Sequence, residues 1–175
     1  MQRRLTLAFT LLVFGLTFAA CDGDTPATPT PGSSTRFTAV LLPANEVPAI
    51  AGAEAAGSGT ATITLNFTTD SLGYATAATF DFSVTAAGFP NGTALTDAHI
   101  HGGNAGANGG ILVSLGLTAG EVILANGTGS FTKNGVRVTV DQANAILANP
   151  SAFYLNIHTA ANPGGVARGQ LAIAQ

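Results

Sequence analysis

The residues of this chain best suited to chemistry are its three histidines, which all lie in two short segments. His99 and His101 belong to Asp97–Asn104, and His158 belongs to Tyr154–Thr159. Both segments alternate polar and apolar residues, which predicts strands with one face in a core. Two histidines two residues apart on a strand point the same way, with Cβ atoms about 6.5–7 Å apart. With a third imidazole from a neighbouring strand, they could form a three-histidine site for copper or zinc with one position left open.

Other polar residues could support such a site. Asp97 shares the polar face of its strand and could orient a histidine ring through a hydrogen bond. Glu46 could reach the cluster from a proline-flanked loop. Arg168 lies in a third alternating segment, Val166–Ile173, and could guide an anion.

Each of these residues also has a purely structural interpretation, and the sequence leaves both open. The histidines could hydrogen-bond loop backbones and hold the glycine-rich loop 102–110 against the sheet. Glu46 could satisfy amides of its own loop, and Arg168 could clamp a strand to a loop. The choice depends on whether the three rings meet in space.

Several functional classes lack the residues they need. The chain has no Gly-x-Ser-x-Gly motif, and no Gly-Lys-Ser/Thr follows the glycine-rich loop, so hydrolase and phosphate-loop functions are not indicated. The net charge is -3 and the chain contains no basic run and no tryptophan, which excludes a nucleic-acid-binding interpretation. We predict no catalytic residue, and a non-enzymatic function is favoured.

The elements that must position the histidines are short strands. Charged residues make up only 9 % of the chain, against about 25 % in an ordinary soluble domain, and glycine, alanine and threonine take their place. Asn134-Gly135 is typical of a two-residue hairpin turn. One short helix is expected over Gln142–Leu147, with Asp141 as its cap. About eight strands and this helix predict an all-β fold, an antiparallel Greek-key β-sandwich or barrel over residues 37–173.

The N-terminal part predicts export and a membrane anchor. Residues 1–20 have a positive start and an apolar run too short for a comfortable membrane span, which is typical of a signal peptide. The sequence Phe18-Ala19-Ala20-Cys21 resembles a bacterial lipobox, in which the cysteine is lipidated. Residues 21–36 are rich in proline, threonine and serine and predict a tether. The expected location is the bacterial cell envelope, with the domain facing the periplasm or the cell surface and Cys21 contacting the membrane.

Four motifs resemble the CHRD (chordin-type) domain. They are Glu46-Val47-Pro48, Ala98-His99-Ile100-His101-Gly102, Tyr154–Thr159 and Asn162–Leu171, in the order that the family has them. The resemblance covers about Phe37 to Ile173. Bacterial members are mostly secreted or envelope proteins without an assigned activity, so the resemblance implies a family but no reaction.

A weaker similarity links the His-x-His strand, the late histidine and Arg168 to copper/zinc superoxide dismutases, which are Greek-key sandwiches. That likeness implies copper ligands at His99, His101 and His158 and an anion-guiding role for Arg168, but the further histidines and the disulfide of that family are missing. Two hypotheses follow. The favoured one is a lipid-anchored, non-enzymatic scaffold with a protein or glycan partner. The alternative is a mononuclear copper or zinc site, which could be redox-active.

Overall fold

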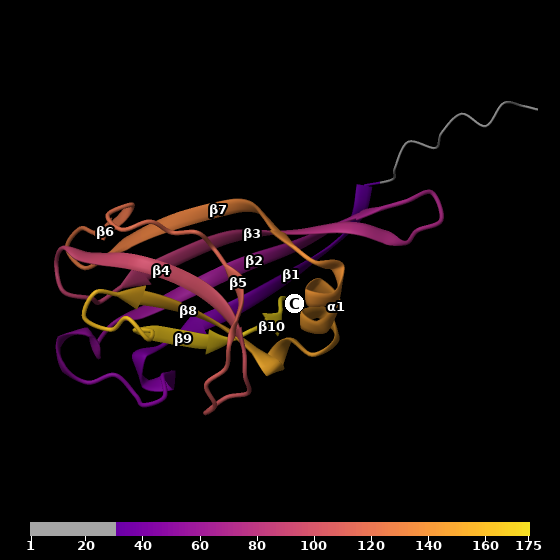
Figure 1. The fold of residues 1–175 in the computed structure, drawn as a ribbon. Coiled ribbons are helices and arrows are strands. Elements are labelled where there is room, and N and C mark those ends of the chain that lie inside the picture. Colours follow the sequence, from indigo (N-terminus) through magenta and orange to yellow (C-terminus); the bar gives the residue numbers. More distant parts are fainter. Residues whose placement is uncertain (1–30) are drawn as a thin grey trace, which may run out of the picture.

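Two antiparallel β-sheets, packed face to face, make up the part of the chain that the computed structural model describes, residues 31–175 (Figure 1). The predicted signal peptide, Cys21 and most of the predicted tether lie outside these residues. One sheet has the strand order β10-β1-β2-β3-β7, and the other has the order β5-β4-β8-β9 with β6 also paired to β4. The strands are β1 (Pro31–Leu41), β2 (Ser58–Thr69), β3 (Ala75–Ala87), β4 (Thr93–Gly102), β5 (Ile111–Ser114), β6 (Val122–Leu124), β7 (Gly129–Val138), β8 (Phe153–Thr159), β9 (Ala167–Gln170) and β10 (Ala172–Ile173).

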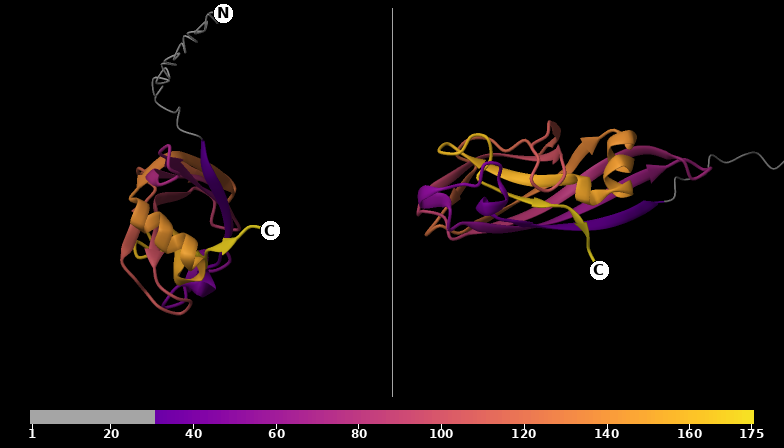
Figure 2. Two further views of the ribbon diagram at one scale, coloured as in Figure 1. Left: turned by 90° about the vertical axis from the view of Figure 1, so that its right-hand side faces the viewer. Right: turned by 90° about the horizontal axis from the view of Figure 1, so that it is seen from below.

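The predicted all-β, antiparallel sandwich with one short helix is confirmed, and the sheets do not close into a barrel. The described residues form ten strands instead of about eight, because β6 and β10 are only three and two residues long. The helix, α1 (Val140–Ala148), lies across one end of the sandwich (Figure 2). Three single 3-10 turns complete the secondary structure: η1 (Pro43–Asn45), η2 (Gly52–Glu54) and η3 (Pro150–Ala152).

The core lies between the two sheets and follows the alternation of the sequence. Over residues 59–65 of β2 and 78–86 of β3 every second residue is buried, including Ile63, Leu65, Phe80 and Phe82. The second sheet contributes the apolar residues of β4 and β8. This burial removes apolar surface from water, the main favourable contribution to folding, and it orients β4 and β8 so that their polar residues point away from the core.

Local details differ from the prediction. Asn134-Gly135 does not form a hairpin turn; β7 runs through it with a register shift between Phe80 and Phe82 of β3, which is a bulge. Gly135 has a φ of 66°, and the left-handed backbone that suits a hairpin turn also suits a bulge. The helix begins earlier than expected, and its cap is Thr139, in a capping box with Gln142.

The ends of the domain also differ. β1 begins at Pro31, within the predicted tether of residues 21–36, and pairs with the far end of β2. The predicted C-terminal strand is divided, because β9 pairs with β8 in one sheet whereas β10 pairs with β1 in the other. The chain therefore changes sheets at Leu171, which is buried.

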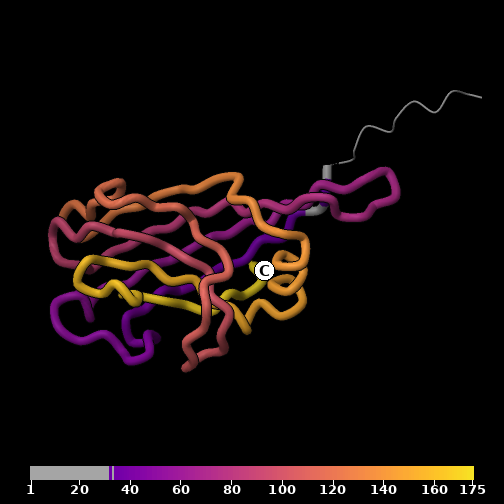
Figure 3. The backbone as a smooth tube through the Cα atoms, in the orientation of Figure 1, coloured from indigo at the N-terminus to yellow at the C-terminus, as the bar shows by residue number. Residues whose placement is uncertain are grey.

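The outer face of the second sheet is covered by loops instead of being exposed. The long β1–β2 connection and the β8–β9 turn lie together at the end of the sandwich opposite α1 (Figure 3). As a result β8 is buried on both faces along nearly its whole length. No helix among the described residues is long and apolar enough to cross a membrane.

Candidate metal centre

The three histidines are brought together by strand pairing. β4 lies next to β8, and the register places Asp97 opposite His158 and His99 opposite Asn156. On the other side of β8, β9 places Arg168 opposite Asn156. Since residues directly opposite each other on neighbouring strands share a face, these polar groups lie on one surface of the sheet. Most of this surface is buried, but the side chain of Asp97 is 38 % exposed.

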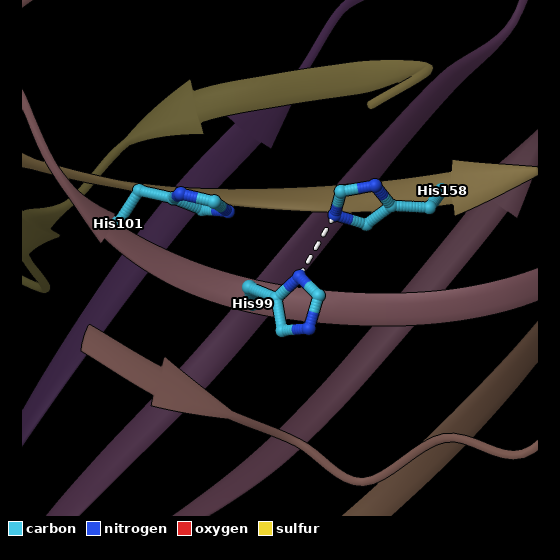
Figure 4. A group of neighbouring side chains, drawn as sticks. All are labelled: His99, His101 and His158. Carbon is cyan, nitrogen blue, oxygen red and sulfur yellow. Dashed lines mark hydrogen bonds between the residues drawn. The ribbon is translucent and has the colours of Figure 1, made fainter. Parts of the chain in front are cut away.

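The imidazole rings meet at the middle of this surface (Figure 4). The ring centroids of His99 and His158 are 4.8 Å apart, those of His99 and His101 are 5.5 Å apart, and those of His101 and His158 are 6.3 Å apart. One nitrogen from each ring can be chosen so that all three lie within 4.8 Å of one another. The three histidine residues are at most 8 % exposed.

Each ring has one nitrogen occupied by an acceptor outside the cluster. His99 Nε2 lies 3.0 Å from Asp97 Oδ2. His101 Nδ1 lies 3.0 Å from the carbonyl oxygen of Gly109, and His158 Nδ1 lies 2.9 Å from that of Pro163. A carbonyl oxygen can only accept, so the facing histidine nitrogens carry the protons. These partners fix the tautomers and leave the second nitrogen of each neutral ring with a lone pair.

Two of these lone pairs face each other. His99 Nδ1 and His158 Nε2 are 2.9 Å apart, which is the contact drawn in Figure 4. Asn156 Oδ1, a third acceptor, lies 2.9 Å from the same His158 nitrogen. Acceptors this close repel one another unless a cation, either a metal ion or an added proton, lies between them. A positive charge placed between these three acceptors would therefore stabilise the arrangement.

Burial favours the neutral rings that a metal requires. It lowers the pKa of His101 and of His158, and the carbonyl oxygens of Gly109 and Pro163, which favour the protonated rings, oppose this effect only in part. At neutral pH these two histidines are therefore uncharged. Neutral imidazole is the form that coordinates copper or zinc.

The distances require a small adjustment before a metal is bound. Metal–nitrogen bonds of about 2.0–2.1 Å at tetrahedral or trigonal angles place ligand nitrogens roughly 3.3–3.6 Å apart. The His99–His158 pair, at 2.9 Å, is closer than this, and the widest separation in the cluster, 4.8 Å, is larger. Shifts of about an ångström, within the reach of side-chain rotation, would bring all three into range.

The predicted supporting residues lie around the cluster in different roles. Asp97 is the direct partner of His99. Arg168 is 2 % exposed, and its Nε and Nη1 groups donate to Asn45 O at 2.6 Å and Asn108 Oδ1 at 2.8 Å, so it holds two loops against the sheet. Glu46 Oε2 lies 3.8 Å from Arg168 Nε. Burial raises the pKa of Glu46 to about 7, despite the opposing effects of Arg168 and of the amide of Asn156.

Sequence reasoning did not single out two residues at the centre. Asn156 contacts His158, and the Tyr154 ring stacks on His101 with centroids 5.0 Å apart and an angle of 3° between the planes. The guanidinium of Arg168 also lies 4.5 Å from the centre of the Tyr154 ring. The alternation of β8 does place both residues on the polar face with His158, but the sequence assigns neither of them a role in the site.

Comparison with known proteins gives one match. A family model described as the CHRD domain matches residues 37–171. No curated protein and no solved structure matches the chain. The weaker likeness to superoxide dismutases therefore remains a prediction.

Proposed function

We propose that this protein, which belongs to the CHRD-domain family, is a binding module that holds one copper or zinc ion on His99, His101 and His158. The observation that carries the proposal is the 2.9 Å contact between His99 Nδ1 and His158 Nε2. Their hydrogen-bond partners leave both nitrogens as acceptors in the neutral rings, so a cation between them would remove an unfavourable contact.

The chemistry of the ligand set favours copper or zinc. Three neutral imidazoles suit both metals, whereas calcium and magnesium prefer oxygen ligands. When bound, the ion would supply a Lewis acid and, in the case of copper, a redox centre, with one coordination position not taken by a histidine.

The chain's own residues would hold the rings in place for the metal. Asp97, Gly109 and Pro163 fix the tautomers, and Tyr154 supports the ring of His101. Arg168 fastens the loops that carry Asn45 and Asn108 over the sheet. These contacts position ligands and exclude water, and they include no nucleophile, which supports a non-enzymatic module. A protein or glycan partner for the covering loops remains a prediction.

The metal proposal is tested by titrating metal-free protein with zinc and with copper against a competing chelator. We expect one ion per chain, and His101→Ala should lower the affinity by at least 100-fold. Asn104→Ala, an exposed change in the neighbouring glycine-rich loop, serves as the control and should bind like the wild type.

The free energy of unfolding of the metal-free variants separates the two possible effects of His101→Ala. A variant that folds but fails to bind supports the metal site. If the wild type and His101→Ala bind equally, the histidines are structural residues and the scaffold hypothesis stands.

We also infer that the module is displayed at the bacterial cell envelope by lipidation of Cys21. The inference is supported by the signal-like residues 1–20 and by the proline- and threonine-rich segment that follows Cys21. Two or more acyl chains would anchor the protein stably. Mass spectrometry of the N-terminal peptide from the native source should find an acylated Cys21, and an unmodified N-terminus at another residue would refute the anchor.

A further inference from the structure

A cavity of about 560 Å³ adjoins the histidine cluster. It lies between residues 46–51 of the β1–β2 connection and residues 161–165 of the β8–β9 turn, and Glu46, His101 and Tyr154 contribute to its lining. Gly109 and Pro163, whose carbonyl oxygens fix the rings of His101 and His158, line it as well. The cavity therefore reaches one of the three proposed metal ligands, His101, from the side of the covering loops.

Two acceptors in this lining have no hydrogen-bond partner. His101 Nε2 and Glu46 Oε1 are both buried and make no hydrogen bond, as is also true of Arg168 Nη2 outside the lining, although buried polar atoms are nearly always satisfied. The nitrogen carries the lone pair that would bind the metal. The carboxylate oxygen would accept a hydrogen bond from a donor inside the cavity. The lining could thus bind a cation at His101 Nε2 and a hydroxyl or similar donor at Glu46 Oε1.

The other residues of the lining indicate which kind of ligand would fit the cavity. Val47, Pro48, Ile50 and several alanines give an apolar side, and the Tyr154 ring is part of the lining. The lining contains no lysine and no arginine, and the guanidinium of Arg168, which lies next to Tyr154, already contacts Glu46 and Asn108. An apolar ring with a hydroxyl donor fits this chemistry better than a carboxylate or a phosphate.

We propose that the cavity binds a hydroxylated aromatic compound of the phenol or catechol class. Its hydroxyl oxygen would take the coordination position that the histidines leave open, a neighbouring hydroxyl would donate to Glu46, and the ring would pack against the apolar wall. This inference rests on the proposed metal function, since without the metal ion the hydroxyl oxygen has nothing to coordinate.

The test uses zinc-loaded protein, because zinc does not oxidise catechols. Calorimetric titration compares catechol with 1,2-dimethoxybenzene, which has the same ring without donors, and with benzoate, which is anionic. We expect catechol to bind at least ten times more tightly than either. Ala161→Phe, which introduces a large side chain at the cavity wall, should weaken catechol binding at least tenfold, whereas Ala77→Phe on β3 should leave it unchanged.

The outcomes separate this inference from the metal proposal. If zinc does not bind, the metal proposal fails and this inference fails with it. If zinc binds but the three compounds bind equally, or if Ala161→Phe has no effect, only the inference on the cavity is overturned. Zinc released into an ultrafiltrate by catechol would show chelation in place of binding and would also overturn it.

Discussion

Burial shifts the pKa values of three titratable side chains: His101, His158 and Glu46. The shifts of the histidines stabilise the fold at higher pH, whereas the shift of Glu46 stabilises it at lower pH. The pKa of each histidine is lowered, so the unfolded chain takes up protons first. Their contribution to stability is complete above about pH 6.5 and is lost as the pH falls below it. The pKa of Glu46 is raised from 4.5 to about 7, so its contribution is complete below pH 4.5 and is lost as the pH rises to 7.

Glu46→Gln isolates the second effect. As the pH rises from 5 to 8, the free energy of unfolding of the metal-free variant should increase by about 2.5 kcal/mol relative to that of the wild type, because glutamine does not ionise. Urea unfolding at both pH values measures this. Glu121→Gln is the control, since hydrogen bonds to Lys133 and Thr118 lower the pKa of exposed Glu121 and no such gain is expected. Parallel pH profiles for Glu46→Gln and the wild type would contradict the assignment.

At the scale of single residues, the sequence predicts which side chains lie close together but not which groups surround them. The two-residue period of β4 and β8 places His99, His101 and His158 on one face, and this part of the site follows from local pattern alone. The acceptors that fix His101 and His158 are backbone carbonyls of loops, which carry no side-chain signal. The clamping role of Arg168 depends on loops more than 50 residues away in the chain, and its residue type did not distinguish this role from anion guidance.

At the scale of elements, the alternation of β2 and β3 determines which side chains support the sheet that packs against the histidine strands. Phe82 is 1 % exposed in the core, whereas Thr64 points outward from β2 and is only partly buried. Phe82→Ala should lower the free energy of unfolding by about 3–5 kcal/mol, and Thr64→Ala should change it by less than about 0.5 kcal/mol. Chemical denaturation compares the two, and equal effects would mean that the assigned faces are wrong.

Regular elements were predicted well, whereas their ends and interruptions were not. Long alternating runs report burial directly, which is why the two histidine strands, β4 and β8, were predicted from the sequence. Asn134-Gly135 was misassigned because a left-handed glycine serves a bulge as well as a turn, and only the pairing of β7 with β3 distinguishes them. The division between β9 and β10 also could not be predicted from the local sequence, because the alternation continues across Leu171 while the partner strand changes.

At the scale of the whole molecule, the sandwich serves as a rigid support for a buried polar cluster. The inner face of the β5-β4-β8-β9 sheet belongs to the core. Its outer face carries the histidines beneath the β1–β2 connection, the glycine-rich loop 102–110 and the β8–β9 turn. Binding of a metal to ligands on β4 and β8 would therefore stabilise the fold by mass action. An excess of free metal 100 times the dissociation constant would contribute about 2.7 kcal/mol.

The most direct test of the metal centre is X-ray absorption at the zinc edge on the zinc-loaded protein, together with the zinc content per chain. We predict one zinc ion with three imidazole nitrogens at about 2.0–2.1 Å, and the loss of this coordination in His158→Ala. A zinc ion with fewer than two imidazole ligands, or a His158→Ala spectrum identical to that of the wild type, would contradict the assignment of His99, His101 and His158 as a metal centre.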